Sequence, residues 1–222
     1  MPGGPRGMVE GVNLLDGSIL WLNGARIGSQ GFGVADLPAY DLLSYHPDNG
    51  VWEVVAKSNI ARLYHSVALL LKDGLVLIAS SNPNEMPVWP SQTIQGNQWF
   101  KYPTELRIEI FTPWYLEGEK ATQRPEIINM SKRRFSPGDD LDIGFRAYKP
   151  DQDTQVVLYI GGFVTHSLHM GQQMYYLEVE RRTNETLSVQ IPPIKMAPGP
   201  YFIFVLCDGV PSMGEPVMIE KN

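Results

Sequence analysis

The fold is decided by one stretch, Asn13-Leu-Leu-Asp16-Gly17-Ser-Ile-Leu-Trp-Leu22, and by its imperfect copy, Leu69-Leu-Leu-Lys-Asp73-Gly74-Leu-Val-Leu-Ile78. Each copy places an Asp-Gly pair between two apolar runs. This pattern is a strong local signal for a β-hairpin, because glycine adopts the positive φ that a tight turn requires. The sequence therefore predicts two hairpins that repeat with a period of 57 residues.

The segment between the copies extends the repeat. Tyr45-His-Pro-Asp-Asn-Gly50-Val-Trp52 has the pattern of a further strand, turn and strand. Four strands in a period near fifty residues are typical of a kelch-type propeller blade. Two blades cannot close a ring, since propellers have typically four to eight blades that pack against one another. We therefore expect residues 1–120 to form a partial β-propeller, its C-terminal blades, with missing N-terminal blades as the packing partner.

The second half of the chain predicts a different β architecture. Residues 84–101, rich in Pro, Gln and Asn, are typical of an irregular insertion, and the polar segment 117–125 is typical of an interdomain linker. Short apolar alternations then recur with turn signals between them and no helical period, which favours an immunoglobulin-like β-sandwich over residues 124–222. The predicted fold class is all-β. The alternating runs are Leu141/Ile143/Phe145, Val156/Leu158/Ile160, Leu187/Val189/Ile191 and Tyr201/Ile203/Val205.

Composition excludes several classes of partner. The net charge is −6 with Lys and Arg scattered along the chain, which argues against a nucleic-acid surface. The sequence has no apolar run long enough to span a membrane, and Met-Pro-Gly-Gly-Pro-Arg at its start lacks the apolar core of a signal peptide. Cys207 is the only cysteine, so no internal disulfide forms. Its apolar neighbours predict a buried side chain.

Two short strings carry the chemistry, Tyr64-His65-Ser66 and Thr165-His166-Ser167. Two imidazoles and a phenol suit a transition metal such as copper, zinc, iron or nickel, and a phenolate favours oxidised copper or iron. The strings lie about a hundred residues apart, so a shared metal would be held between separate parts of the fold. The alternative is that all four histidines, including His46 and His169, are ordinary surface or hydrogen-bonded residues.

A set of motifs, taken in order, resembles the C-terminal part of a glyoxal oxidase or galactose oxidase-like copper radical oxidase. The order is more specific than any one string, and the resemblance spans nearly the full chain. It implies an early-set domain of immunoglobulin-like fold at the C-terminus. The motifs are Asn23-Gly24-Ala25 with Gly28-Ser29, Arg62-Leu-Tyr64-His65-Ser66, Asp73-Gly74, Ser81-Asn82-Pro83, Tyr102-Pro103-Thr104-Glu105-Leu106, Arg124-Pro125, Thr165-His166-Ser167-Leu168-His169-Met170, Ala197-Pro198-Gly199 and Gly209-Val210-Pro211-Ser212.

The resemblance implies a secreted oxidoreductase. Its members oxidise a small aldehyde or primary alcohol and reduce oxygen to hydrogen peroxide. Tyr64, His65 and His166 would ligate one copper ion, and Tyr64 would be the catalytic base for the substrate's hydroxyl proton. The family motif uses only the first histidine of His166-x-x-His169, so His169 is outside the ligand set. Strict strand alternation would send Tyr64 and His65 to opposite faces, so a bend at a blade rim is expected.

Part of the family's chemistry has no counterpart in this sequence. The family takes its second electron from a tyrosine crosslinked to a cysteine, both upstream of the matched region. Cys207 lies in the predicted sandwich, so we expect a fragment of a copper radical oxidase that is inactive by itself. The alternative is a catalytically dead propeller and sandwich that serves as a binding or structural module. Two further departures are Ser80, where a glycine is usual, and Gln173, where an arginine is usual.

Overall fold

The all-β prediction is confirmed. A computed structural model describes residues 1–92 and 101–221, and within these ranges the regular structure is strand apart from three short 3-10 helices. None of the described helices is long and apolar enough to cross a membrane. Residues 93–100 of the predicted insertion at 84–101 lie outside the described residues. The 3-10 helices are η1 (Pro90–Gln92), η2 (Trp114–Leu116) and η3 (Gly118–Thr122).

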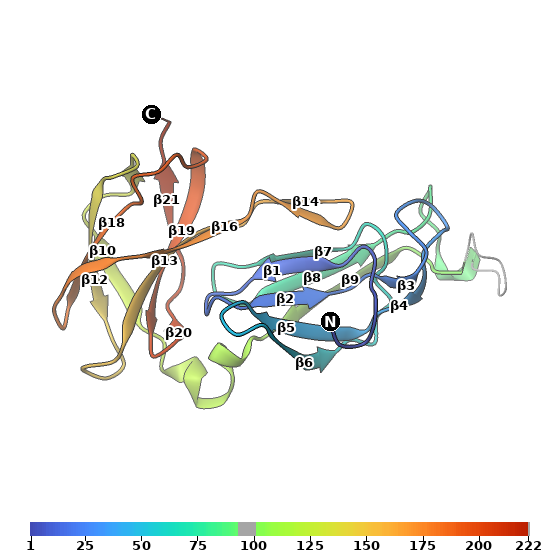
Figure 1. The fold of residues 1–222 in the computed structure, drawn as a ribbon, viewed down its shortest axis with the longest axis horizontal. Helices are drawn as coiled ribbons and strands as arrows, with labels where there is room; N and C mark the ends of the chain where they lie inside the picture. The colour runs from blue at the N-terminus through green and yellow to red at the C-terminus, as the bar shows by residue number, and fades with distance from the viewer. Residues whose placement is uncertain (93–100, 222) are drawn as a thin grey trace. The chain divides into compact units, whose positions relative to one another are not determined.

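The chain forms two compact units (Figure 1). We call them the N-terminal unit (Met1–Leu70, Val76–Phe111 and Gly162–Gly171) and the C-terminal unit (Leu71–Leu75, Thr112–Gly161 and Gln172–Asn222). These units depart from the predicted ranges 1–120 and 124–222 at three points. The turn at 71–75 and residues 112–120 group with the C-terminal unit, and the segment 162–171, which carries His166, groups with the N-terminal unit.

The N-terminal unit contains the strands of both predicted hairpins. Its larger sheet has the antiparallel order β1-β2-β5-β6, in which the Asp16-Gly17 turn joins β1 to β2 (Figure 1). Gly17 has a φ of +86° and its N–H donates to the Leu14 carbonyl, as the Asp-Gly signal predicts. A second sheet has the order β7-β8-β9. The strands are β1 (Glu10–Asn13), β2 (Ile19–Leu22), β5 (Asp41–His46), β6 (Val51–Lys57), β7 (Val67–Leu70), β8 (Val76–Ser81) and β9 (Glu105–Phe111).

Two small strand pairs complete this unit. One is β3 (Ala25–Ile27) with β4 (Asp36–Pro38), and the other is β14 (Phe163–Thr165) with β15 (Leu168–Met170). The β14–β15 hairpin packs on β7 through β14 and on β1 through β15. This packing explains why the hairpin groups with residues far from it in sequence.

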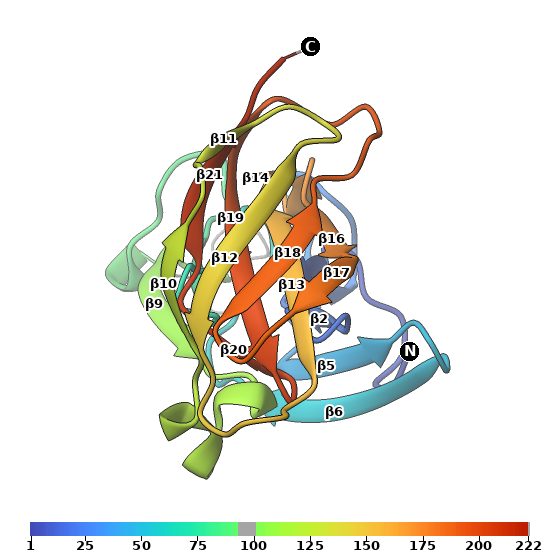
Figure 2. The same ribbon diagram turned by 90° about the vertical axis from the view of Figure 1, so that its left-hand side faces the viewer.

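The C-terminal unit is a two-layer sandwich (Figure 2). One sheet has the order β10-β12-β18-β17, and the other has β11-β21-β19-β13-β16 with β20 beside β19. Between them lies an apolar core that includes Cys207, which is fully buried as predicted. The strands are β10 (Glu126–Met130), β11 (Arg134–Phe135), β12 (Asp140–Arg146), β13 (Thr154–Ile160), β16 (Gln173–Leu177), β17 (Val179–Arg182), β18 (Thr186–Gln190), β19 (Gly199–Cys207), β20 (Val210–Pro211) and β21 (Glu215–Ile219).

Candidate metal centre

The Tyr64–His65 pair lies in a turn just before β7, and the two rings stack with centroids 3.8 Å apart. His65 has a φ of +59°, in the left-handed region that side chains other than glycine rarely adopt. This conformation interrupts strand alternation, so consecutive side chains lie on the same side of the chain. The bend expected from the sequence is therefore present, and it brings the phenol and the imidazole together.

The end of β8 holds this turn by three hydrogen bonds. Ser81 Oγ accepts from the Leu63 N–H at 3.0 Å and donates to the Tyr64 carbonyl at 3.0 Å. The Asn82 N–H donates to the same carbonyl at 2.8 Å. Because the backbone on both sides of Tyr64 is bound to one strand end, the direction of its side chain is fixed.

The tautomer of His65 follows from its partner. His65 Nδ1 lies 3.0 Å from the Asn82 carbonyl oxygen, which only accepts hydrogen bonds, so Nδ1 is the donor. The lone pair of the neutral ring is then on Nε2. Metal-binding histidines are commonly oriented in this way, with the remaining ring N–H held by a backbone carbonyl.

His166 lies in the two-residue turn of the β14–β15 hairpin. His166 and Ser167 have φ values of +53° and +60°, the conformation of a type I′ turn, which normally contains Asn or Gly. The His166 ring is anchored through Nδ1, which lies 2.7 Å from Thr165 Oγ1, and Gln30 Nε2 donates to the His166 carbonyl at 3.4 Å. A histidine is therefore held at a strained turn position by contacts on both its ring and its backbone.

The structure brings the three predicted residues together. The His166 ring centroid lies 5.2 Å from that of His65 and 5.9 Å from that of Tyr64. Within the described residues, neither histidine Nε2 nor the Tyr64 hydroxyl has a hydrogen-bond partner. The three rings therefore lie together, and their outer donor atoms have no hydrogen-bond partner within the described residues, which suits metal ligands.

The donor chemistry of this cluster fits copper. Two imidazole nitrogens with a phenol oxygen match the preference of Cu(II) for nitrogen and hard oxygen ligands. The described residues contain no group of three His, Cys, Asp or Glu side chains that could hold a metal. The mixed set of Tyr64, His65 and His166 is therefore the best candidate for a metal centre in the described part of the chain.

The two other histidines have partners elsewhere. His46 Nε2 lies 3.1 Å from Ser44 Oγ within β5, and His169 Nδ1 lies 3.3 Å from the Gly11 carbonyl of β1. His169 pairs with Val164 across the hairpin, one position removed from the turn that carries His166. The ordinary hydrogen-bonded interpretation of a histidine suits these two residues.

An aromatic ring borders the cluster. Phe32, in the loop between β3 and β4, has its ring centroid 6.3 Å from Tyr64 and 6.2 Å from His65. It is 44% exposed. Sequence reasoning missed Phe32, and the available signal was its flanking glycines, Gly31 and Gly33, both of which have positive φ. Phe32 supplies an apolar wall beside the donors.

A buried arginine, Arg62, lies two residues before Tyr64 in the chain. Arg62 is 1% exposed, and its guanidinium donates to Glu109 Oε2 at 3.0 and 3.1 Å, to the Ser80 carbonyl at 2.8 Å and to the Arg107 carbonyl at 3.0 Å. Ser80 has a φ of +60°, next to a register shift between Ala79 and Ser81. This geometry explains why glycine suits the position of Ser80, and it places a carbonyl where Arg62 binds it.

A buried carboxylate, that of Glu10, accepts a hydrogen bond from Ser66, the residue that follows His65. Glu10 is 1% exposed, and its Oε1 accepts from Ser66 Oγ at 2.5 Å and from Asn23 Nδ2 at 3.0 Å. Burial raises the pKa of Glu10, opposed by the hydrogen bond from Ser66. Neither Glu10 nor Arg62 was assigned a role from the sequence.

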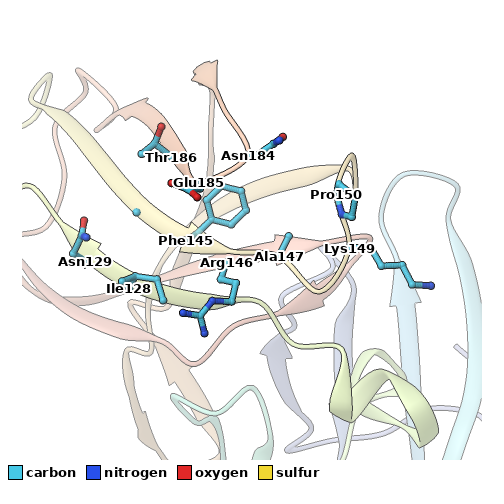
Figure 3. A pocket seen from close by; sticks show the side chains of 11 residues that line it. Ile128, Asn129, Phe145, Arg146, Ala147, Lys149, Pro150, Asn184, Glu185 and Thr186 are labelled. Carbon is cyan, nitrogen blue, oxygen red and sulfur yellow. The ribbon is translucent and has the colours of Figure 1, made fainter.

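A surface pocket of ≈ 520 Å³ lies elsewhere, on the C-terminal unit (Figure 3). Phe145, Arg146 and Glu185 are among its lining residues, and none of the three convergent donors is. Its lining residues include no group of candidate metal ligands. The three-donor cluster therefore remains the better candidate for the functional site, although it does not lie in this pocket.

These features define an all-β protein with a candidate copper centre, and comparison with known proteins identifies its family. Residues 1–115 match the family model described as glyoxal oxidase N-terminus, and residues 124–219 match that of the galactose oxidase-like early set domain. The chain belongs to the glyoxal oxidase family. The family resemblance and the C-terminal early-set domain inferred from the sequence are thereby confirmed.

Similar proteins agree with this assignment. The aldehyde oxidase GLOX1 of Arabidopsis thaliana is 34% identical over 96% of this chain and 36% of its own length. The aldehyde oxidase GLOX of Vitis pseudoreticulata is 35% identical over 97% of this chain and 42% of its own length. The chain thus spans about two fifths of these relatives. A fungal alcohol oxidase of the AA5 family, solved in complex with copper, shares the fold with a TM-score of 0.81 at 18% identity, over 99% of this chain and 43% of that one.

Proposed function

We propose that this chain carries the copper-binding part of a secreted oxidase that converts aldehydes or primary alcohols with reduction of oxygen to hydrogen peroxide. The convergence of Tyr64, His65 and His166 is the observation that carries the proposal. The names of the similar plant aldehyde oxidases support the substrate class. Extracellular location comes from the family resemblance.

Copper bound here would supply one-electron redox chemistry and contact with oxygen. His65 and His166 would hold it through Nε2, because Asn82 and Thr165 occupy the Nδ1 atoms. Tyr64 would bind through its phenol oxygen and accept the hydroxyl proton of the substrate as general base. Phe32 would cover one side of the centre and limit the access of water.

The crosslinked radical site is not encoded in these 222 residues. Cys207 is fully buried in β19, and burial raises the pKa of its thiol, so it stays neutral within the sandwich core. We therefore propose that the chain by itself binds copper without oxidising substrate. The same observation favours the second candidate, a catalytically dead binding or structural module.

The domain organisation belongs to the same proposal. We propose that the N-terminal unit is part of a kelch-type propeller and that further blades cover its exposed strand faces. The four-stranded antiparallel sheet β1-β2-β5-β6 has the form of a blade. Leu106, Ile108 and Ile110 of β9 are between 50 and 65% exposed, which is unusual for a row of large apolar residues. The greater length of the similar oxidases supports such a partner.

Titration of the purified chain with Cu(II), followed by calorimetry and electron paramagnetic resonance, tests the proposal. His65→Ala and His166→Ala are expected to weaken copper binding more than about tenfold, since each removes one of three donors. His46→Ala is the matched control, because its ring is bound to Ser44 outside the cluster. Equal affinity for all three variants and the unchanged chain would refute the copper site.

A turnover assay separates the two candidate functions. The copper-loaded chain is incubated with methylglyoxal or a primary alcohol, and hydrogen peroxide is measured. We expect none, because the only cysteine is committed to the sandwich core. Peroxide release above that of the Tyr64→Phe variant would show that the chain is a complete oxidase. Copper binding without release supports the copper-binding fragment, and failure to bind copper supports the dead module.

A further inference from the structure

Glu10 is an unusual residue for the strand that contains it. It lies on the buried face of β1 together with Val12, and both side chains are almost fully inaccessible. Its Oε1 accepts two hydrogen bonds, from Ser66 Oγ and Asn23 Nδ2, while Oε2 is buried without a hydrogen-bond partner among the described residues. A buried carboxylate is costly, so its position calls for a role.

The hydrogen bond from Ser66 connects Glu10 to the candidate ligands. Ser66 directly follows His65 and is fully buried. At 2.5 Å, its hydroxyl bond to the carboxyl group has the length of the strong O–H···O⁻ class. Glu10 therefore anchors the C-terminal side of the Tyr64–His65 turn, whose preceding side is held by β8. Since His65 is in the left-handed region, each anchor opposes relaxation of the turn.

The same strand also touches the segment that carries His166. The carbonyl of Gly11, next to Glu10, lies 3.3 Å from His169 Nδ1, and β1 packs against β15. Thus β1 contacts the residue after His65 through the Glu10 side chain, and strand β15 of the hairpin that carries His166 through the Gly11 carbonyl. It is therefore a strand that links the two segments supplying the imidazoles.

We propose that Glu10 is a positioning residue of the copper centre, which holds the Tyr64–His65 turn through Ser66 at the spacing that lets both imidazoles reach one ion. This inference rests on the proposed copper-binding function. Glu10 itself contacts neither the three donors nor the ion; it acts through Ser66.

Three variants of the full 222-residue chain test the role. Glu10→Leu removes both acceptor oxygens, whereas Glu10→Gln keeps an amide oxygen that accepts from Ser66 and Asn23. Val12→Ala is the matched control, because it truncates a fully buried side chain on the same face of β1 without removing a side-chain hydrogen bond. Comparison of Glu10→Leu with Val12→Ala thus separates the loss of the carboxylate from general damage to the strand.

The probe is Cu(II) alone. We expect Glu10→Leu to weaken copper binding on the order of 10- to 100-fold, the range typical for partners that orient metal ligands, and to change the copper hyperfine splitting. Glu10→Gln is expected to restore most of the affinity and the unchanged spectrum. Val12→Ala should lower the melting temperature while the copper spectrum stays the same. Equal effects of Glu10→Leu and Val12→Ala on copper affinity would overturn the proposal.

A second variant and a second measurement complete the test. If Glu10→Leu does not fold, Glu10→Asp replaces it, because the shorter side chain keeps the charge but draws the carboxylate away from Ser66. An unchanged copper spectrum of Glu10→Asp then refutes the positioning role. Histidine ring signals in nuclear magnetic resonance spectra of the metal-free chain separate this inference from the proposed function. They should shift for His65 in Glu10→Leu and not in Val12→Ala, even if the unchanged chain binds no copper.

Discussion

The Arg62–Glu109 ion pair gives a quantitative prediction about what holds the candidate site. Arg62 is 1% exposed and donates four hydrogen bonds to three different residues. Arg62→Met removes the charge and the planar donor group while it keeps much of the side-chain volume. The Ser80 and Arg107 carbonyls then lose a donor, and Glu109 loses its cation.

The magnitude follows from burial. Removing one partner of a buried pair costs about 3–5 kcal/mol. The Glu109 side chain keeps 31% exposure, so water partly solvates the orphaned carboxylate, and we expect a loss of about 3 kcal/mol, near the lower end. Arg62→Lys retains the charge but not the forked geometry, so its loss should be intermediate.

Urea unfolding followed by circular dichroism measures this loss, because the strand signal reports on both units and therefore on the control variant as well. Arg146→Met is the control. The Arg146–Glu126 pair has a similar length of 2.9 Å, but its side chains are 73% and 62% exposed, so its removal should change the free energy of unfolding by less than about 1 kcal/mol. If both variants lose the same free energy, burial does not determine the strength of the Arg62 pair, and the reasoning fails.

Three further predictions concern other parts of the chain. A hydrogen bond from Lys101 lowers the pKa of Asp36 to about 2, so the ionised carboxylate stabilises the fold above its unfolded value of 3.8. The stability advantage over Asp36→Asn should therefore shrink in urea unfolding as pH falls from 3.8 towards 2. The exposed apolar row of β9 should make the chain self-associate, and Ile108→Glu should reduce that association in sedimentation velocity; an unchanged association would place the contact elsewhere. We expect the C-terminal sandwich to be the more stable unit, so limited trypsin digestion should cut in or near the exposed helix Gly118–Thr122 and leave a resistant C-terminal piece. A resistant N-terminal piece alone would contradict this order of stability.

Local patterns were sufficient to predict the two Asp-Gly hairpins and the alternating strands of the C-terminal half. The Asp16-Gly17 and Asp73-Gly74 pairs specified their hairpins because the turn needs a positive φ, and both glycines have one. Alternation in the C-terminal half specified strands because one face of each is buried in a common core. The grouping of residues 162–171 with the N-terminal unit was not predictable in the same way, since it depends on packing between segments far apart in sequence.

Only part of the candidate site was accessible to sequence reasoning. Tyr64, His65 and His166 were identified by donor chemistry and family resemblance, and their convergence needed the structure. Glu10 and Arg62 were missed because a charged residue in a strand or loop normally faces solvent. One signal did exist for Glu10, which falls in phase with Val12 on the apolar face of β1. A charge on the buried side of an alternating pattern indicates a buried interaction.

The backbone strain around the candidate site links its stability to its chemistry. Asn23, His65, Ser80 and the His166–Ser167 turn all have positive φ without being glycine. Such residues persist only where the surroundings hold them, and they commonly gather at functional sites. Here the holding groups are identifiable: Glu10 binds Asn23 and the residue after His65, and Arg62 binds the Ser80 carbonyl. Two buried ionisable groups thus hold the turns that direct the phenol and one imidazole towards a common point, which gives a physical reason for costly buried groups beside the candidate metal centre that are not themselves candidate ligands.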